Sequence, residues 1–394
     1  MKPMKKILGL LLALCLIAGC TSVFAAGIPV EQVKIGYITI GDENEGYSAN
    51  HLNGLKEAQA ALGISDDQVL CKYNVPETED AYEAAIDLAE QGCNIIFATS
   101  FGHESYVFQA AAEYPDIQFC HATGTAAMSS PLNNVHNYFY AVYESRYVSG
   151  VVAGMKLAQM IEDGTITAEN AKIGYVGAFP FAEVISGFTS FFLGARSQCP
   201  SVTMEVRYTN SWGDMALEKE TAEALIADGC VLISQHADTT GAPSACEAAG
   251  VPCVGYNISM LPVAPNTALT SAAGDWGAYV TYAVKCLIDG EEIARDWCKG
   301  YAEGAVYTTE LNDSIVAPGT AEKVAELEEA FKAGTVKVFD TSTFTVNGET
   351  LTSYTTAYGL EGIEMVSDGE FHESSVRSAP YFDILIDGIT AVVE

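Results

Sequence analysis

The side chains best suited to bind a ligand occur in short polar segments that directly follow apolar, strand-like runs. Aromatic rings stand there among amides, carboxylates and small residues, and the candidates are Tyr47, Asn50, Phe101, Gly102, Phe179, Trp212, Asp238, Asn257, Asp275 and Trp276. Any one of these rings could equally pack in a core, but their recurrence at equivalent positions favours a binding surface. Planar faces with a few carboxylates and amides suit a flat, neutral, hydrogen-bonding ring such as a purine.

Catalytic and metal-binding motifs are absent from the sequence. The chain has no G-x-S-x-G nucleophile motif and no phosphate-binding loop of the G-x-x-x-x-G-K-S/T type. Its six histidines lack the spacing of a metal site, and the acidic run 42–45 lacks the ligand pattern of an EF-hand. We therefore expect a binding protein that uses no cofactor and no metal, and not an enzyme.

Two other classes of protein stay compatible with these residues. An exported purine nucleosidase would need general acid and base groups in its cleft, and Asp238 and Asp275 are the carboxylates that could supply them. A ligand-presenting sensory lipoprotein would pass its ligand to a membrane receptor.

The charge balance of the chain restricts its partners. The 394 residues include 19 Lys and Arg against 51 Asp and Glu, which gives a formal net charge of −32 at pH 7. A chain so poor in cations cannot neutralise a row of phosphates, and nucleic acid is therefore excluded as a partner. With 49% hydrophobic and 18% charged residues, the composition indicates a folded protein with room for two domains.

The first 20 residues are typical of an export signal. Three lysines precede an apolar run at 7–18 that is too short to span a membrane. The run ends in Ile-Ala-Gly-Cys, which resembles the lipobox of bacterial lipoproteins, where the cysteine, here Cys20, is diacylated. Ordinary signal cleavage at 25–26 is the alternative. We expect a lipid anchor on Cys20, a linker at 21–32, and a protein on the outer face of the cytoplasmic membrane or in the periplasm.

The cysteines do not indicate a disulfide framework. Two of the eleven, Cys15 and Cys20, belong to the signal, and the nine that remain are an odd number. Most of them begin or lie within apolar runs, where a free cysteine packs as a small hydrophobic residue. The chain contains no C-x-x-C motif, and a single bridge between Cys246 and Cys253 is compatible with the sequence but not required by it.

From residue 33 onward, short apolar runs alternate with helical patterns. We expect strands at 33–40, 69–73, 93–98, 117–121 and 135–140, and helices at 49–62, 80–91 and 104–114. Strands that are joined by helices at this spacing form right-handed crossovers within a parallel sheet.

The same pattern begins again near residue 171, where Lys172-Ile173-Gly174-Tyr175 repeats Lys34-Ile35-Gly36-Tyr37. We expect strands at 171–177, 202–208, 231–235 and 253–256, and helices at 144–161, 184–198 and 217–228. The predicted fold is α/β, with two Rossmann-like lobes that contain parallel sheets. Because ligands bind at the carboxyl ends of parallel strands, we expect the ligand in a cleft between the lobes.

Six segments of the chain resemble the basic membrane protein (BMP) family of ABC-transporter substrate-binding lipoproteins, most closely the branch associated with free purine bases. The segments are 46–51, 119–124, 143–154, 209–214, 235–238 and 333–335. The resemblance covers about 33–338 and implies a type I periplasmic-binding-protein fold. It also implies that the protein delivers a small-molecule ligand, a purine base or nucleoside, to the permease subunits of an ABC importer, and we expect a monomer.

The resemblance also assigns roles to individual residues. The family's ligand-binding positions are matched here by Phe101, Phe179, Trp212 and Asp238. Tyr47 stands where the purine branch usually has tryptophan, so that stacking is kept with a smaller face. Asn257 and Ser259 stand where aspartate is common, and an amide can donate as well as accept hydrogen bonds.

We expect four parts after the linker. They are a first lobe at 33–143, the interlobe helix and second lobe at 144–290, a return segment at 291–338 that packs on the first lobe, and a strand-rich extension at 339–394. Within the extension, Asn347-Gly348 predicts a hairpin turn.

Overall fold

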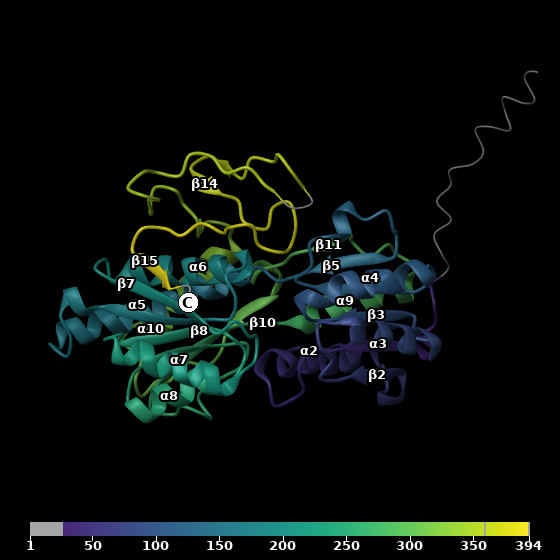
Figure 1. Ribbon diagram of the computed structural model, residues 1–394, viewed down its shortest axis with the longest axis horizontal. Coiled ribbons are helices and arrows are strands. Elements are labelled where there is room, and N and C mark those ends of the chain that lie inside the picture. Colours follow the sequence, from purple (N-terminus) through teal and green to yellow (C-terminus); the bar gives the residue numbers. More distant parts are fainter. Residues whose placement is uncertain (1–26, 358–359, 393–394) are drawn as a thin grey trace, which may run out of the picture.

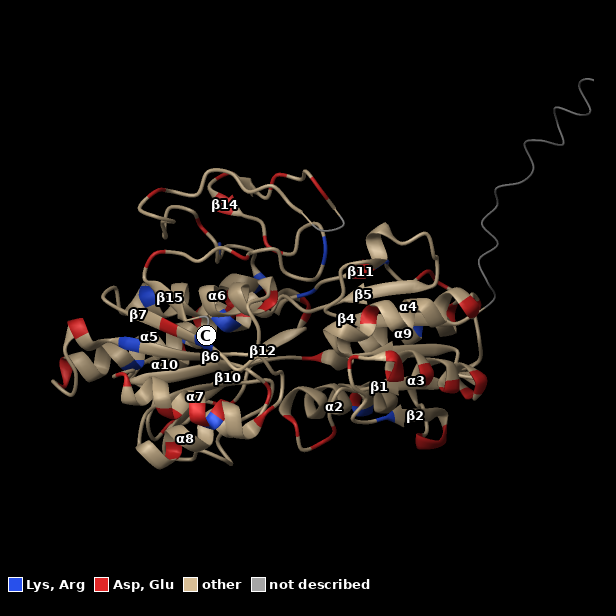
Figure 2. Ribbon diagram, in the orientation of Figure 1, with Lys and Arg blue, Asp and Glu red and all other residues tan. Residues whose placement is uncertain are grey.

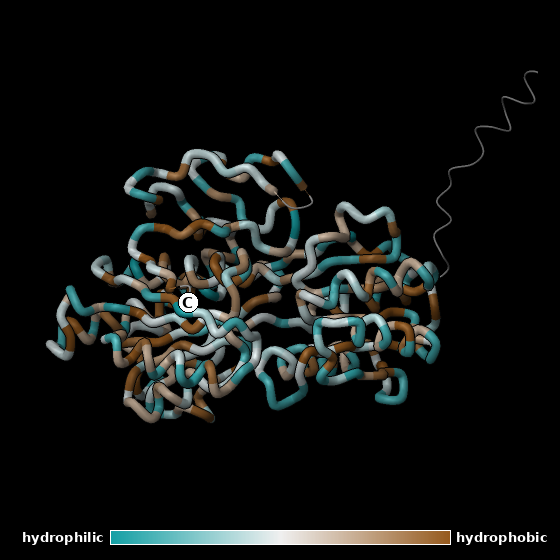
Figure 3. The backbone as a smooth tube through the Cα atoms, viewed as in Figure 1, coloured by the Kyte–Doolittle hydropathy of each residue, from teal (hydrophilic) through white to brown (hydrophobic). Residues whose placement is uncertain are grey.

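The computed structural model describes residues 27–357 and 360–392. The expected export signal and the lipidation site at Cys20 lie outside the described residues. Within the described part, no helix is long and apolar enough to cross a membrane. Figure 1 shows two lobes side by side, each built on a sheet that is flanked by helices, and Figure 3 shows apolar segments concentrated inside both.

The first lobe is built on a parallel sheet with the strand order β11-β5-β4-β3-β1-β2. Its strands are β1 (Ile35–Ile38), β2 (Val69–Lys72), β3 (Ile95–Ala98), β4 (Gln118–Ala122), β5 (Val135–Tyr138) and β11 (Asp296–Trp297). The central strands are apolar along their whole length because helices cover both faces of the sheet. The five strands predicted for this lobe are confirmed, and β11 joins the sheet edge from far along the chain.

Of the four helices described in the first lobe, three follow its own strands, and the fourth, α9, follows a strand of the second lobe. They are α2 (Gly46–Leu62), α3 (Glu79–Glu90), α4 (Glu104–Glu113) and α9 (Trp276–Asp289), with short 3-10 turns η1 (Val30–Gln32), η2 (Asp66–Gln68), η3 (Phe101–His103) and η4 (Ala127–Ser129). The side chain of Glu45 caps α2 by accepting hydrogen bonds from the backbone N–H groups of Tyr47 and Ser48. This cap places Tyr47 in the first turn of the helix, next to the end of β1.

The second lobe is built on a larger sheet with the order β12-β10-β9-β8-β6-β7-β15. Its strands are β6 (Lys172–Gly177), β7 (Thr203–Tyr208), β8 (Leu232–His236), β9 (Cys253–Tyr256), β10 (Ala268–Gly274), β12 (Val306–Thr308) and β15 (Ile389–Val392). All pairs are parallel except β10 with β12. The predicted architecture of two α/β lobes with parallel sheets is therefore confirmed.

The helices of the second lobe pack tightly on one another. They are α5 (Val142–Glu162), α6 (Ala182–Gln198), α7 (Met215–Ala227), α8 (Gly241–Ala249) and α10 (Thr320–Lys332), with the 3-10 turns η5 (Ala168–Asn170) and η6 (Tyr301–Glu303). A Cβ atom at Gly150 of α5 would lie 2.0 Å from the Phe191 carbonyl oxygen, and one at Gly194 of α6 would lie 2.1 Å from the Tyr147 carbonyl oxygen. Only glycine at these positions allows the two helices to approach so closely.

The chain crosses between the lobes at three places in the described part, and these crossings correct the expected boundaries. Helix α9, placed by the sequence in the second lobe (144–290), packs on α2 of the first lobe. The return segment 291–338 was expected on the first lobe, but only β11 pairs there, whereas β12 pairs with β10 and α10 packs on α5. The crossings follow β5, β10 and β11, which is why consecutive elements fall in different lobes.

The C-terminal extension contains little regular structure, so the expectation that it is strand-rich is wrong. In its described residues the strands are β13 (Val366–Ser367), β14 (Glu370–Phe371) and β15, and β15 adds to the edge of the second lobe's sheet beside β7. The hairpin turn is confirmed, because Val346 and Glu349 exchange both backbone hydrogen bonds at 2.8 and 3.1 Å. Asn347 and Gly348 have φ values of 53° and 81°, as a type I′ turn requires.

All nine cysteines of the described part carry free thiols. Cys246 and Cys253, for which the sequence left a bridge open, are both buried in the core around α8. They therefore contribute to packing as small hydrophobic residues.

Candidate functional site

The carboxyl ends of strands from both lobes face a cavity of about 310 Å³ between them. Its lining residues follow β1, β3 and β4 in the first lobe and β6, β7, β8 and β9 in the second. They are Ile40, Tyr47, Thr99, Ser100, Phe101, Thr123, Glu183, Trp212, Asp238 and Tyr256. The cavity thus lies where parallel strands of two sheets converge, the usual place for a ligand in such folds.

A larger hollow of about 1110 Å³ adjoins this cavity and shares Ile40, Trp212 and Asp238 with it. We call it the mouth. It lies between the loop after β1, with Asp42 and Glu45, and the loops after β6 and β7. Trp212 and Asp238 therefore stand at the boundary between the inner cavity and the mouth.

Aromatic rings from both lobes meet above the cavity. The ring centroid of Phe101, in the first lobe, lies 5.5 Å from that of Phe181 in the second. Phe181 stacks on Phe179 at 5.1 Å, and Phe179 packs edge-on against Trp212 at 5.1 Å. These four rings form a continuous apolar bridge across the cleft, so the structure shows the lobes in a closed arrangement.

Backbone and amide contacts hold the same closed arrangement. The N–H of Gly46 donates to the Asp238 carbonyl at 2.9 Å, and the amide of Asn50 donates to the Gly274 carbonyl at 2.9 Å. Both bonds join α2 to the second lobe. On the cavity floor, the Tyr47 hydroxyl donates to the Thr99 carbonyl at 2.5 Å and fixes the tyrosine ring.

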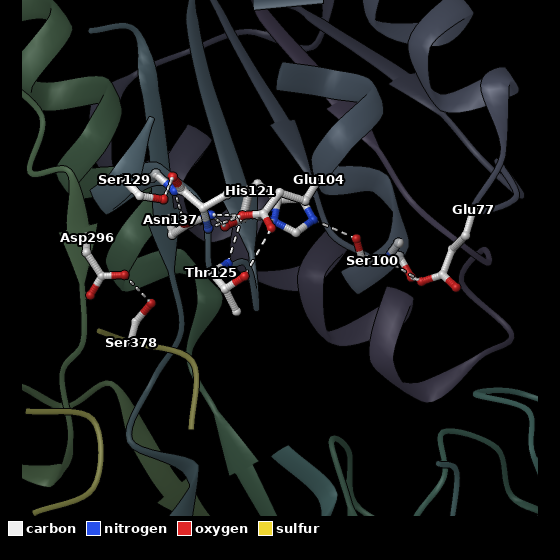
Figure 4. Close-up of polar contacts among 12 residues, drawn as sticks. Glu77, Ser100, Glu104, His121, Thr125, Ser129, Asn137, Asp296 and Ser378 are labelled. Carbon is white, nitrogen blue, oxygen red and sulfur yellow. Dashed lines mark hydrogen bonds and ion pairs between the residues drawn. The ribbon is translucent and has the colours of Figure 1, made fainter. Parts of the chain in front are cut away.

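Two partly buried carboxylates support the loops of the first lobe that line the cavity (Figure 4). Glu77 accepts hydrogen bonds from the Ser100 hydroxyl at 2.6 Å and from the Gly102 N–H at 2.7 Å. Glu104 accepts from the Thr125 N–H at 2.8 Å and from the Asn137 amide at 2.9 Å. The loops after β3 and β4 are therefore set before any ligand arrives, which reduces the entropy that binding must restrict.

The structure brings four of the predicted site residues to the cavity itself: Tyr47, Phe101, Trp212 and Asp238. Phe179 lines the mouth instead, and Gly102 lies in the supporting loop with its N–H bonded to Glu77. Asn257 is fully buried behind Asp238 and donates to its carboxylate at 2.8 Å.

The remaining predicted residues lie elsewhere. Asn50 and Asp275 line a separate hollow of about 1340 Å³ between α2 and β12. Asp275 also caps α9 by accepting a hydrogen bond from the Ala278 N–H. Trp276 is 1% exposed and stacks on His51 with a centroid distance of 3.9 Å, so it belongs to the core. Asp238 and Asp275 therefore do not share a cavity, as the nucleosidase alternative would require.

Several residues at the cavity were not predicted from the sequence, above all Glu183 and Tyr256. Behind these two lie Arg146 and His236, which are almost completely buried. A lone arginine in an otherwise small and apolar helical segment, 145–154, is a local signal that could have identified Arg146. Glu183 could have been found as an acid in the first turn of a helix that follows a strand.

Burial and mutual repulsion control the charge of the cavity. Burial raises the pKa of Glu183 to about 8 and that of Glu218, which accepts from the Thr239 N–H, to about 7. The pKa of Asp238 is also raised, by burial first and then by Glu45, Glu218 and Glu183. No lysine or arginine lines the cavity or the mouth in the described part, and acidic side chains prevail over both lobes (Figure 2).

Comparison with known proteins finds a family and several relatives. Residues 38–338 match the profile of the Bmp family, described as ABC transporter substrate-binding protein PnrA-like. The chain is 34% identical over 311 residues to a purine-binding protein of Brucella abortus, which covers 78% of this chain and 83% of that protein. It is 30% identical over 336 residues to a Haloferax volcanii protein, TsgA13, whose name describes an ABC transporter glucose-binding component, with 85% and 81% covered.

Solved structures support the fold. A solute-binding protein of an ABC transporter system from Aeropyrum pernix superposes with a TM-score of 0.66 at 17% identity, covering 78% of this chain and 93% of that one. Another from Conexibacter woesei gives 0.58 at 21% identity, covering 77% and 98%. The type I periplasmic-binding-protein fold expected from the resemblance is thereby confirmed.

Proposed function

Because the chain belongs to the PnrA-like family of ABC transporter substrate-binding proteins, which bind a solute and carry out no reaction on it, we propose that its cavity binds a purine base or nucleoside. We propose further that the protein delivers this ligand to the permease of an ABC importer. Substrate-binding proteins of ABC importers act outside the cytoplasm, and the nucleosidase alternative is set aside with the family assignment.

The lining of the cavity is the observation that carries the proposed ligand class. It combines the aromatic rings of Tyr47, Phe101 and Trp212 with the carboxyl groups of Glu183 and Asp238, and it contains no basic side chain. Such a lining suits a flat ring with N–H donors, and it offers no cation to a phosphate or a carboxylate.

The relatives point to two ligand classes that can be separated by experiment. The 34% identical relative is a purine-binding protein, whereas the name of the 30% identical relative refers to glucose. A sugar also stacks on aromatic rings and donates to carboxylates, but it lacks the flat aromatic faces that suit the rings of Tyr47, Phe101 and Trp212. We therefore favour the purine.

The test is to identify and then titrate the ligand. We expect mass spectrometry of the denatured protein to release a purine that co-purified with it, and calorimetry of the stripped protein to give tight binding of adenine, guanine or hypoxanthine. Adenosine, inosine and glucose serve as comparison ligands. Binding of glucose without any purine would overturn the proposed ligand class.

Delivery to a permease requires a test in cells. We expect uptake of a radiolabelled purine to fall when the gene for this protein is deleted and to recover when it is restored. A deletion strain with unchanged purine uptake, together with tight binding in solution, would favour the alternative role of a sensory lipoprotein.

The evidence for a lipid anchor is the Ile-Ala-Gly-Cys segment that ends at Cys20. We propose that a lipid on Cys20 holds the protein on the outer face of the membrane. Labelling of cells with a clickable palmitate should mark the wild type and not Cys20→Ala, and Cys20→Ala should be released while keeping its ligand affinity. Cys15→Ala, in the same signal, is the matched control. An unlabelled wild type would contradict the anchor.

A further inference from the structure

Glu183 lines the cavity, and its carboxyl accepts no hydrogen bond from the described residues of the protein. It lies in the first turn of α6 and lines the inner cavity, and its side chain is 12% exposed. No group among the described residues donates a hydrogen bond to its carboxyl, and the nearest polar neighbour is His236 Nε2, 3.6 Å from Oε1. A buried carboxyl without a donor is costly, so a donor from the ligand fits there.

A buried cation lies behind this carboxyl. Arg146 is 0% exposed; one of its N–H groups donates to the Gln235 carbonyl at 2.7 Å, and its guanidinium carbon lies 3.6 Å from the centre of the Tyr256 ring. No carboxylate of the described part lies within 4.0 Å of it, and its Nε and Nη2 have no hydrogen-bond partner there. Arg146 acts on Glu183 across His236 and favours the ionised carboxylate.

The second carboxyl of the cavity has a different neighbour. Asp238 accepts a hydrogen bond from the Asn257 amide at 2.8 Å, so it forms part of a carboxylate and amide pair. Asn257 does not line the cavity, so only the Asp238 carboxyl is offered to the pyrimidine edge of a purine. Glu183 has no amide partner and suits a single N–H donor. In a free purine base the imidazole edge carries one such N–H, and in a nucleoside the sugar replaces it.

The two carboxyls also differ in the space around them. Asp238 borders the mouth of about 1110 Å³, whereas Glu183 borders only the inner cavity, next to Tyr256 and His236. A ribose on the imidazole edge would stand between the ring and the Glu183 carboxyl. A methyl group there would already remove the N–H and meet the carboxyl.

We propose that Glu183 accepts the imidazole N–H of the ligand and thereby makes the protein select free purine bases over nucleosides. This inference rests on the proposed function, because it assigns the orientation of the purine in the same cavity. Arg146 partly offsets the effect of burial on the pKa of Glu183, and His236 Nε2 lies 3.6 Å from the carboxyl.

The test compares adenine with 9-methyladenine, which keeps the pyrimidine edge and lacks any imidazole N–H. We expect calorimetry on the wild type to give at least about tenfold weaker binding of 9-methyladenine, because the hydrogen bond to Glu183 is lost and the methyl group meets its carboxyl. In Glu183→Ala the affinity for adenine should fall. The ratio of the dissociation constants of 9-methyladenine and adenine should then shrink to within about threefold. Asp238→Asn is the matched control: it should weaken both ligands and keep the ratio.

The outcomes separate this inference from the proposed function. If the wild type binds 9-methyladenine as tightly as adenine, or if Glu183→Ala keeps the full preference, the assignment of Glu183 is wrong while purine binding stands. If the wild type binds no purine, the proposed function itself fails. Glu183→Gln, which keeps the size and one acceptor oxygen, should retain an intermediate ratio, and it decides the matter if Glu183→Ala does not fold.

Discussion

At the scale of single residues, Trp212 is fixed by its surroundings and presents one face to the ligand space. Its carbonyl accepts a hydrogen bond from the Asp238 N–H at 2.8 Å, and Phe179 packs edge-on against its ring at 5.1 Å. The residue borders both the inner cavity and the mouth. An indole held in this way on one side is suited to stack on a ring that enters the cavity.

We expect Trp212→Ala to weaken purine binding at least about tenfold, roughly 1.4 kcal/mol, because both the stacking and the buried indole surface are lost. Calorimetry with adenine measures the change. Trp297→Phe is the control, because Trp297 packs on Tyr279 in the first lobe with a centroid distance of 5.2 Å and does not border the cavity. Near-wild-type affinity in a folded Trp212→Ala protein would assign the indole to structure alone.

The buried carboxyls and histidines respond to pH in opposite directions. Burial raises the pKa of Glu183 to about 8 and that of Glu144 to about 7, above the ordinary value of 4.5. Burial lowers the pKa of the histidines, for example to about 4 for His103 and His136. Between pH 4.5 and 6.5 these contributions to the free energy of unfolding oppose each other. Above pH 6.5 the histidines are neutral in both states, so the carboxyls dominate.

We therefore expect the ligand-free protein to lose stability as the pH rises from 6.5 to about 8. In this range the folded state still holds protons on Glu183 and Glu144 that the unfolded state has released, so a rise in pH favours unfolding. Arg146 and Glu77 act on Glu183 with opposite signs. Calorimetric melting across this range should show a falling Tm, with a shallower slope in Glu183→Gln. An identical slope in that variant would mean that Glu183 is already ionised in the folded protein.

At the scale of elements, local sequence patterns predict the strands and helices that form from contacts between residues close together in the sequence. The strand predicted at 33–40 is observed as β1 at Ile35–Ile38, and the two lobes follow from the alternation of strands and helices. Helix α2 was expected from 49 but begins at Gly46. The difference arises because its cap is Glu45, a residue type less usual at this position than Ser, Thr, Asp or Asn.

Contacts between distant segments leave no local signal. Trp276 follows a strand, as a binding residue would, but it opens α9, which returns to the first lobe and packs its indole on His51. The neighbours of Glu183 also come from distant segments, His236 from β8 and Arg146 from α5, so only its place after a strand could have indicated it. Trp212 and Asp238 could be placed because each directly follows a strand, and the ends of parallel strands converge.

The extension is an integral part of the second lobe, and β15 shows this most clearly. It pairs in parallel with β7 from Ile389 to Val392, and Arg196 of α6 donates to the Thr343 and Asp387 carbonyls next to it. The strand covers a sheet edge that would otherwise present unpaired backbone groups. The family profile ends at residue 338, so this strand lies beyond the matched region.

We expect Ile389→Ala to destabilise the protein by about 2–4 kcal/mol, because Ile389 is buried against the core of the second lobe. Val392→Ala is the matched control on the same strand, since Val392 is 37% exposed, and it should cost less than about 1 kcal/mol. Urea unfolding measures both values. Equal effects of the two substitutions would show that the strand does not contribute to the core.

At the scale of the whole molecule, the lobes touch through few polar contacts. Apart from the Phe101 and Phe181 rings, α2 reaches the second lobe through the Gly46 N–H and the Asn50 amide. The crossings that follow β5, β10 and β11 form the connection around which the lobes can rotate. Gly274 lies at one crossing, where a Cβ atom would meet the Tyr140 ring at 2.3 Å, so only glycine allows the two crossing segments to pack there.

Opening of the cleft must break these contacts and expose Phe101 and Phe181 further, whereas a purine in the cavity adds contacts to both lobes at once. Ligand binding should therefore shift the population toward the closed form, as hinge motions do in periplasmic binding proteins.

We expect small-angle scattering to give a smaller radius of gyration with saturating adenine than without it. Asn50→Ala, which removes one hydrogen bond between the lobes and no cavity residue, should open the ligand-free protein further and still close with adenine. If adenine leaves the scattering curves of both proteins unchanged, the lobes do not close on the ligand. Adenine would then have to enter a cavity that is already closed.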